Sequence, residues 1–202
     1  MTYGQYCGLA RSLDVIGDRW TLLIIRELMA GRSRYQEIRA GLPGVATNLL
    51  AERLRRLETD GLLRRDGVDY VLTHRGEDLR PVLRELIRWA APLMRGGQAD
   101  DHFDGTWLIV ALEALLAPSS QGLVQIHSGG ATIHVLSDEL ENVMVGNGPA
   151  VGADATLTAG GDVVLGIATG HVRLLDSVSR GIATIEGDVE TATAVLEGGH
   201  RR

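Results

Sequence analysis

Hydrophobic residues recur at helical spacing over residues 47–59, and polar residues stand between them. At 100° per residue, Leu50, Leu54 and Leu57 fall on one side of a helix, where they can be buried. The opposite side carries a polar set, which is Asn48, Ala51, Glu52 and Arg55. Thr47 or the turn before it can cap this helix, and Gly61 ends it. The pattern predicts a helix with one buried and one outward side.

The chain before this segment predicts three further helices. Residues 3–17 carry apolar side chains at helical spacing, and residues 20–29 are apolar nearly all round, as a central core helix must be. Asp18 is a candidate cap for the second helix, and Ser33 for a short third helix over 34–39. A turn at Pro43-Gly44 then separates the third helix from the fourth, which predicts a helix-turn-helix.

After Gly61, residues 62–65 and 69–72 predict two strands joined around Asp66-Gly67, a strong hairpin signal. Such a hairpin would form the wing of a winged helix. Thr73 can cap a last helix that runs to about Met94, in which Pro81 marks the true start or causes a kink. The apolar arcs of the first and last helices exceed what a small core can cover, which predicts a homodimer built from these two helices.

Composition changes at residues 95–101, where arginines become sparse and glycines frequent. We therefore predict a domain over residues 1–97, a linker over 98–104 and a second domain over 105–202. In the second domain, an apolar helix (107–116) precedes strands at 123–127, 131–136, 140–145 and 155–158. Helices at 163–169 and 172–179, a strand at 182–186 and a last helix capped by Asp188 follow. The fold class is α+β, with a mainly antiparallel sheet in the second domain.

The chain of 202 residues contains 20 arginines and no lysine, which reflects either codon bias or a use for forked, always-charged donors. Residues 1–97 have 16 Arg against 12 acidic residues, and residues 98–202 have 4 Arg against 14, so the halves carry +4 and −10. This division predicts a polyanion-binding module attached to an acidic domain. A single cysteine excludes an internal disulfide, and no membrane span or secretory leader is visible, which predicts a cytoplasmic protein.

The outward side of the fourth helix supplies candidates for reading DNA bases, because Asn suits adenine, Arg suits guanine and an Ala methyl suits thymine. Glu52 could accept from cytosine or reject a wrong register. The base-reading candidates are Thr47, Asn48, Ala51, Glu52 and Arg55. The candidates for phosphate contacts are Ser33, Arg34, Tyr35, Arg53, Arg56, Arg64 and Arg65. Any one of these arginines alone could equally belong to a solvated helix face.

The run from Cys7 to Leu28 (CGLARSLDVIGDRWTLLIIREL), together with residues 43–65 and the sequence YVLT at 70–73, resembles the HxlR-type winged helix-turn-helix transcription regulators. The resemblance spans roughly residues 3–95 and implies a dimeric repressor or activator of bacterial genes. In this family a cysteine near the start of the first helix can sense electrophiles or oxidants, and Cys7 occupies that place. Gly8 follows it where the family often has proline. Cys7 could instead be a small apolar residue that packs the first helix.

The second half is similar to the sterol carrier protein type two-like fold through ATIHV at 131–135, ADATLT at 153–158 and GIATIEGD at 181–188. That fold encloses a tunnel for lipids or other apolar molecules, and no catalytic motif comes with it. The resemblance implies a ligand pocket bordered by Trp107, Ile133, Val143, Leu165 and Leu174. Ordinary core packing gives the same apolar composition, so both readings stay open.

These observations predict a sequence-specific DNA-binding regulator, acting as a repressor, that responds to an apolar small molecule bound by the second domain. Its partners would be a double-stranded DNA operator, a second copy of the chain and that ligand, with no membrane. We expect no cofactor, no metal at His127, His134 or His171, and no enzymatic activity. One alternative is a lipid or small-molecule carrier whose winged helix is only an interaction module. Another is a redox or electrophile sensor that acts through Cys7.

Overall fold

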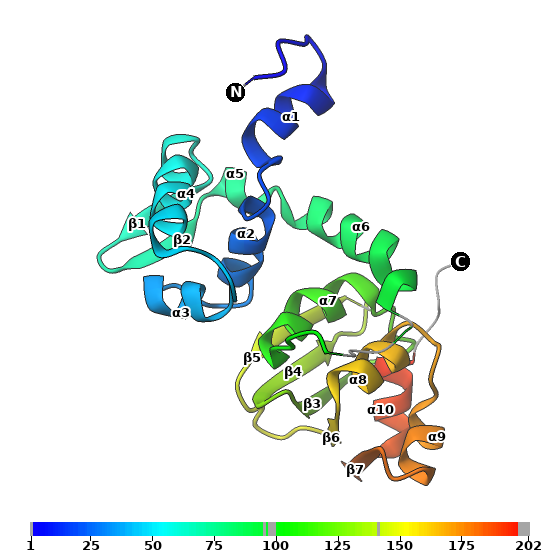
Figure 1. Cartoon of the computed structure of the whole chain (residues 1–202). Helices are drawn as coiled ribbons and strands as arrows, with labels where there is room; N and C mark the ends of the chain where they lie inside the picture. Colours follow the sequence, from blue (N-terminus) through cyan, green and yellow to red (C-terminus); the bar gives the residue numbers. More distant parts are fainter. Residues whose placement is uncertain (1, 95, 97–99, 141, 198–202) are drawn as a thin grey trace. The chain divides into compact units, whose positions relative to one another are not determined.

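The computed structural model of the chain describes residues 2–94, 96, 100–140 and 142–197 (Figure 1). The chain divides into two compact units, one up to Leu83 and one from Arg84 onward. We call them the N-terminal unit and the C-terminal unit. The linker expected at 98–104 lies partly outside the described residues, and the domain limits 1–97 and 105–202 stay a prediction. No helix within the described ranges is both long enough and apolar enough to cross a bilayer.

The N-terminal unit contains the predicted helix-turn-helix followed by the predicted hairpin. Its elements are α1 (Gly8–Ile16), α2 (Thr21–Met29), α3 (Tyr35–Ala40), α4 (Thr47–Thr59), β1 (Leu63–Asp66), β2 (Asp69–Leu72) and α5 (His74–Glu77). Strands β1 and β2 are antiparallel, with Asp66 opposite Asp69. Ile24, Ile25 and Ile38 are completely buried and form the centre of the core with the apolar side of α4.

Three helix starts in the N-terminal unit differ from the prediction. The N-cap of α2 is Trp20 instead of Asp18, whose carboxylate accepts a hydrogen bond from the Trp20 N–H (3.0 Å). Helix α1 begins at Gly8 instead of residue 3, and Gly4 before it has a positive φ of 64°, which interrupts a helix.

Helix α3 begins after Arg34, so Ser33 is not its cap. The carboxylate of Glu37 instead accepts hydrogen bonds from the backbone N–H groups of Ser33 (3.1 Å) and Arg34 (3.0 Å). These bonds, the one from Arg34 first, lower the pKa of Glu37.

The helix predicted from Thr73 to Met94 is divided. Thr73 accepts a hydrogen bond from the Gly76 N–H (3.2 Å) and caps α5, which ends at Glu77. Helix α6 (Arg80–Ala90) follows, and a 3₁₀ turn, η1 (Ala91–Met94), completes the segment. Pro81 therefore marks the start of a new helix, because a residue without an N–H is tolerated in a first turn.

The C-terminal unit is an α+β fold around a five-stranded sheet in the order β5-β4-β3-β6-β7. Its elements are η2 (Gly105–Trp107), α7 (Leu108–Leu115), β3 (Gly122–Ser128), β4 (Ala131–Ser137), β5 (Val143–Asn147), β6 (Ala155–Ala159), α8 (Gly161–Ala168), α9 (Leu174–Ser179), β7 (Ala183–Gly187) and α10 (Val189–Leu196). Neighbouring strands are antiparallel except β3 and β6, which are parallel. The sheet is thus mixed: three of its four strand pairs are antiparallel, as the sequence predicts for most of the sheet, and the parallel pair of β3 and β6 was not expected.

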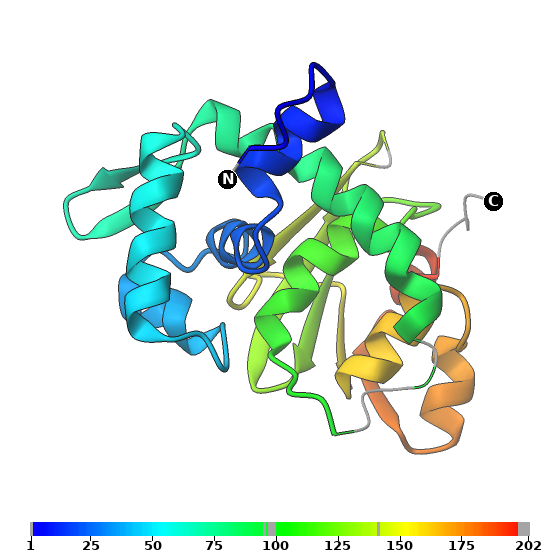
Figure 2. The ribbon, with the colours of Figure 1, turned by 45° about the horizontal axis from the view of Figure 1, so that its top comes forward.

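One face of this sheet forms the core of the unit. Its apolar residues are almost completely buried; they are Val124, Ile126, Ile133, Val135 and Leu157. Helix α7 contacts β5, and α10 contacts β3 and β6. Figure 2 shows α7 beside the part of α6 that belongs to this unit, and Arg88 Nε donates to the Ala114 carbonyl across them (2.7 Å).

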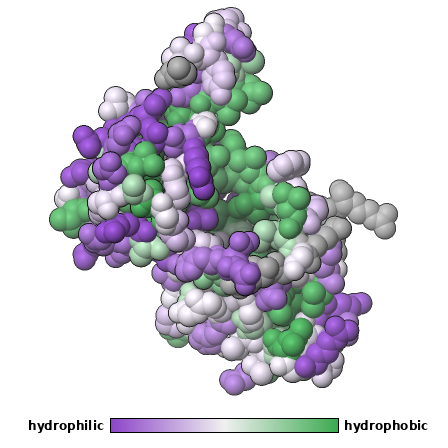
Figure 3. Space-filling model, in the orientation of Figure 1, coloured by the Kyte–Doolittle hydropathy of each residue, from purple (hydrophilic) through white to green (hydrophobic). Residues whose placement is uncertain are grey.

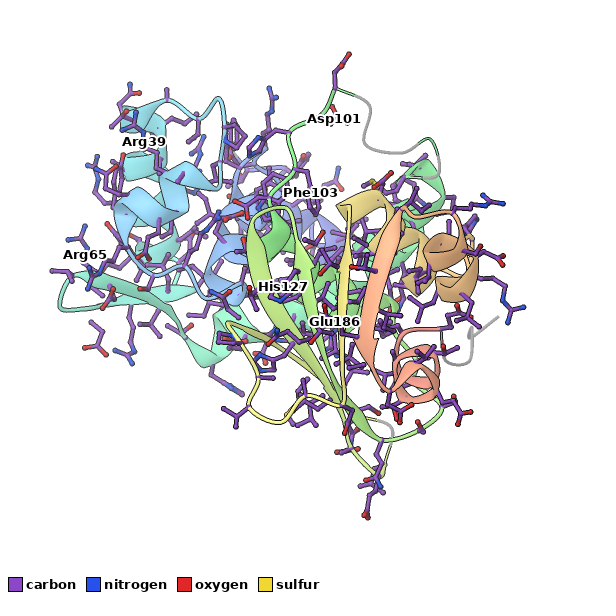
Figure 4. The ribbon with its side chains drawn as sticks, turned by 90° about the horizontal axis from the view of Figure 1, so that it is seen from below. Arg39, Arg65, Asp101, Phe103, His127 and Glu186 are labelled. Atoms are coloured by element: carbon purple, nitrogen blue, oxygen red, sulfur yellow. The ribbon has the colours of Figure 1, made fainter. Side chains whose placement is uncertain are left out.

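The opposite face of the sheet is polar. His127 Nδ1 lies 2.9 Å from Thr132 Oγ1, and its Nε2 lies 3.1 Å from the Gln125 side-chain nitrogen. Gln125 Oε1 accepts from the backbone N–H of Ala150 (3.0 Å), which ties the loop after β5 to this face. Figure 4 labels His127 on β3 and Glu186 on β7. The histidines in β3 and β4 are thus polar residues of a strand face.

Candidate nucleic-acid interface

Helix α4 has the two sides that its sequence predicts. Leu50, Leu54 and Leu57 are 0 %, 1 % and 2 % exposed, which fixes the helix to the core. Of the base-reading candidates, Thr47, Asn48, Glu52 and Arg55 are exposed and Ala51 is half-buried. The exposed side of α4 therefore starts in the first turn of the helix and extends along about two turns, from Thr47 to Arg55.

The first turn of α4 is held by α3. The Tyr35 hydroxyl donates a hydrogen bond to the backbone carbonyl of Thr47 (2.8 Å). The N-cap of α4 is Ala46, and no side chain bonds to the first N–H groups of the helix. The residue Thr47 thus lies inside the helix instead of capping it, and Tyr35 positions the first turn from its carbonyl side.

The start of α3 is joined to the wing, which is the hairpin of β1 and β2. Ser33 Oγ donates to Asp69 Oδ1 (2.7 Å), and Arg34 Nε lies 3.6 Å from the same carboxylate oxygen. The backbone N–H of Tyr70 also donates to the Ser33 carbonyl (2.8 Å). These bonds bring two of the predicted phosphate-contacting residues, Ser33 and Arg34, together with the wing.

The wing carries two exposed arginines in β1. Arg65 Nη2 donates to the Tyr70 hydroxyl (2.7 Å), and its guanidinium lies 4.9 Å from the centre of the Tyr70 ring. Arg64 lies 3.3 Å from Asp66. Figure 4 shows Arg65 on the wing and Arg39 on α3, both pointing outward from the N-terminal unit. Arg39 is exposed and was not among the sequence candidates, since nothing in the local pattern distinguishes it from a solvated residue.

Two arginines of α4 face inward toward other parts of the unit. Arg53 is only 18 % exposed and lies 2.7 Å from Asp18. Arg56 Nη2 donates to the Asp14 carbonyl (2.9 Å) and its Nε lies 3.6 Å from Asp60. We therefore assign Arg53 to an intramolecular ion pair in place of the phosphate contact expected from the sequence. Arg56 remains half-exposed and can do both.

A buried ionic cluster joins α2 to the turn between α3 and α4. Glu27 of α2 is completely buried, and its two carboxylate oxygens lie 2.5 Å from Arg26 and Arg32 respectively. Arg26 also donates to the Gly41 carbonyl (3.2 Å), in the turn between α3 and α4. Burial of a charge is costly unless it is paired and hydrogen-bonded. The cluster thus fixes the turn that sets the direction of α4. No local sequence pattern distinguishes Glu27 from an exposed helical residue.

The five residues predicted to border an apolar pocket in the C-terminal unit have unequal environments. Ile133 and Leu174 are buried in the core, whereas Trp107, Val143 and Leu165 are half-buried. A pocket of about 520 Å³ beside α9 and α10 is lined by none of the five. Their arrangement fits core packing, and a tunnel in this unit stays a prediction.

Cys7 is exposed and stands at the position just before the first turn of α1. The backbone N–H groups of Ala10 and then Leu9 lower the pKa of its thiol. The N-terminal end of a helix stabilises a thiolate in this way. The thiol is therefore accessible and more readily ionised than an ordinary cysteine.

The helices of the N-terminal unit, the exposed second helix of its helix-turn-helix and the following hairpin define the winged helix-turn-helix class of DNA-binding proteins. The comparisons identify the family within this class. Residues 15–97 match the HxlR-like helix-turn-helix proteins. The chain is 37 % identical over 87 residues to the uncharacterized HTH-type transcriptional regulator YvaP of Bacillus subtilis (strain 168), which is 40 % of this chain and 81 % of YvaP. The protein belongs to the HxlR-like helix-turn-helix family.

Two further proteins are similar to part of the chain. The uncharacterized HTH-type transcriptional regulator YkvN of B. subtilis (strain 168) is 33 % identical over 117 residues, which is 54 % of this chain and 95 % of YkvN. The crystal structure of quinone-bound YodB from B. subtilis is 37 % identical, covers 42 % of this chain and 96 % of YodB, and superposes with a TM-score of 0.40. YvaP and YkvN are both named as HTH-type transcriptional regulators, which supports a DNA-binding regulator.

Proposed function

We propose that the protein is a sequence-specific repressor that places α4 in the major groove of its operator. The observation that carries this proposal is the outward side of α4, which is exposed from its first turn while the opposite side is buried. In this arrangement base edges meet Thr47, Asn48, Ala51, Glu52 and Arg55. The backbone phosphates meet Ser33, Arg34, Tyr35, Arg56, Arg64 and Arg65.

We propose further that the protein binds as a homodimer through α1 and α6. Tyr6 and Leu9 of the α1 region are 104 % and 68 % exposed, and Trp89 of α6 and Leu93 of η1 are 75 % and 74 % exposed. Figure 3 shows hydrophobic surface at α1 and along α6. A pair of α4 helices would then read two half-sites about 34 Å apart, one helical turn of DNA.

Fluorescence anisotropy with the DNA upstream of the protein's own coding sequence tests the proposal. The protein should bind this DNA far more tightly than a shuffled sequence, and the affinity should fall steeply with added salt because phosphate contacts release counterions. Equal affinity for both sequences would contradict operator recognition and would favour the carrier alternative, in which the winged helix is an interaction module.

A response to electrophiles or oxidants through Cys7 is a second candidate function, which the exposed thiol with its lowered pKa favours. A thiolate reacts with these reagents, whereas a thiol does not. The operator complex should dissociate on treatment with diamide or a quinone, and Cys7→Ser should prevent the dissociation. An equal response of wild type and Cys7→Ser would exclude this function.

Sensing of an apolar small molecule by the C-terminal unit remains part of the proposal. Its support is the half-burial of Trp107, Val143 and Leu165, which leaves them reachable at the edges of an otherwise filled core. A thermal-shift screen with fatty acids and other hydrophobic metabolites tests it. A hit must also change operator affinity. Without such a change, the unit would be a dimerisation or spacer element.

A further inference from the structure

A cavity of about 310 Å³ lies within the N-terminal unit, between α1 and the flank of α4 that carries Arg53 and Arg56. The last turn of α1 forms one wall, and Tyr3 from the segment before α1 also borders it. The other wall is the inward flank of α4, with Arg53, Arg56 and Leu57, and Asp60 at its end. The volume lies at the lower end of the range of small-molecule sites.

The polar walls of this cavity are the same groups that hold α4 to α1. Arg56 bonds the Asp14 carbonyl (2.9 Å), and Arg53 lies 2.7 Å from Asp18 in the segment after α1. The backbone N–H of Tyr3 donates to Asp14 Oδ1 (2.8 Å) and folds the N-terminal segment over α1. A molecule in the cavity therefore touches the joint between α1 and the proposed recognition helix.

Two polar atoms in the cavity's lining residues lack a hydrogen-bond partner among the described residues. They are Arg53 Nε, a donor, and Asp60 Oδ2, an acceptor, and both are shielded from solvent. Asp60 Oδ2 forms an ion pair with Arg56 Nε at 3.6 Å, which is too long for a hydrogen bond. A buried polar atom without a partner is costly, so each gains when its side chain turns toward a ligand that supplies the missing bond.

The separation of Arg53 and Asp60 along α4 sets the length of the ligand. Arg53 and Asp60 are two helical turns apart, which is about 10 Å along the axis of α4. Leu57 lies between them along the helix, and Leu13 lines the cavity from α1. The site thus fits an elongated molecule with a flat apolar middle, an acceptor at one end and a donor at the other.

We propose that this cavity binds a neutral, para-substituted aromatic compound, with a carbonyl oxygen directed to Arg53 and a hydroxyl directed to Asp60. A neutral ligand is favoured because three carboxylates and two guanidinium groups already line the site, a net charge that repels an anion. Binding there loosens the joint between α1 and α4 and weakens operator binding. This last step rests on the proposed function, whereas binding itself does not.

Isothermal titration of the full chain with 4-hydroxybenzamide tests the site. This probe is not an electrophile, so its binding is independent of Cys7. Wild type should bind one molecule per chain, and Leu13→Phe should weaken binding at least tenfold because the ring fills the cavity. Leu140→Phe is the matched control: it makes the same change at an exposed position of the C-terminal unit, outside the cavity lining and outside the proposed dimer surface, and should bind as wild type does.

Two analogues test the ligand chemistry. Benzamide lacks the hydroxyl and 4-hydroxybenzoate adds a negative charge, and each should bind at least tenfold more weakly than 4-hydroxybenzamide. Absence of saturable binding up to millimolar probe, equal binding by Leu13→Phe and Leu140→Phe, or tighter binding of the anion would overturn the proposal. If the probe binds but leaves operator affinity unchanged, the regulatory step is wrong and the site stands. If no operator is bound at all, the proposed function fails independently of the titration.

Discussion

The two units bury different kinds of side chain. In the N-terminal unit, the carboxylate of Glu27 lies inside the core between Arg26 and Arg32. In the described part of the C-terminal unit, the buried polar side chains are Ser128, Ser137 and Ser177, and the sheet's inner face is apolar. The difference indicates that the direction of α4 depends on a buried ionic cluster, whereas the core of the C-terminal unit is packed mainly from apolar side chains.

The largest expected effect comes from removing the centre of the ionic cluster. Glu27→Ala leaves Arg26 and Arg32 without their carboxylate in a buried site, and this should lower the free energy of unfolding by about 3–5 kcal/mol. Urea denaturation measures the loss. Glu58→Ala, an exposed acidic residue on α4, is the matched control and should cost less than about 0.5 kcal/mol. Equal losses would mean that the cluster does not stabilise the unit.

A substitution that creates a cavity in the apolar core of the C-terminal unit should lower the free energy of unfolding somewhat less than Glu27→Ala does. Leu157→Ala removes a completely buried side chain from β6, in the interior of the sheet, with an expected loss of about 2–5 kcal/mol. Hydrogen exchange should show the loss in the strands of that unit and should leave the protection of α2 and α4 intact. Val151→Ala, at a fully exposed position, provides the control. Equal loss of protection in both units would show that they unfold together.

The two flanks of α4 should separate DNA binding from stability. Asn48→Ala and Arg55→Ala should each weaken operator binding by about 1–3 kcal/mol, with little change in the urea midpoint, because both side chains are exposed. Anisotropy titration measures the affinity. Arg53→Ala should instead lower the midpoint, since it breaks the pair with Asp18. Arg180→Ala in the C-terminal unit controls for the loss of a positive charge.

If Asn48→Ala and Arg55→Ala bind the operator as wild type does, the outward side of α4 does not read the bases. If Arg53→Ala weakens operator binding without changing the urea midpoint, its assignment to the intramolecular pair is wrong and the phosphate contact expected from the sequence returns.

The smallest effect concerns the cap of α10. The Thr191 hydroxyl and backbone N–H, with the Glu190 N–H, bond to Asp188 and lower the pKa of that carboxyl. A lowered pKa means that the charged form stabilises the fold above the ordinary aspartate pKa of about 3.9. That contribution disappears as pH falls through the lowered value. The Tm of Asp188→Ala should lie below that of wild type at pH 7 and converge with it near pH 2. A constant difference across this range would contradict the titration.

The N-terminal unit was largely predictable because its signals are local. The leucines of α4 repeat at helical spacing, and Asp66-Gly67 marks the hairpin turn. Local pattern does not show where a polar side chain points: Arg53 and Arg55 look alike in sequence, yet one pairs with Asp18 and the other is exposed. The sequence predicts Ser33 as a cap because serine is common at that position, but its hydroxyl donates to Asp69 of the wing. That bond joins residues far apart in the sequence.

The C-terminal unit shows what strand patterns leave undetermined. The prediction starts β5 at Leu140, yet the strand begins at Val143, because Asp138 accepts hydrogen bonds from the backbone N–H groups of Leu140 (2.8 Å) and Asn142 (2.9 Å) and holds a turn there. The strands themselves were found, but alternation within a strand does not reveal which strand lies beside it. The parallel neighbours β3 and β6 are therefore visible only in the structure.

That parallel pair has a consequence for how the chain acquires its structure during synthesis. Strand β3 cannot complete its hydrogen bonds until β4, β5 and the following loop have been made and β6 has arrived beside it. Pairings between distant segments form slowly, whereas short helices and a hairpin form from neighbouring residues. The winged helix also leaves the ribosome first. It should reach its native form while the sheet is still incomplete, so the nascent chain would carry a finished DNA-binding surface before the acidic half has folded.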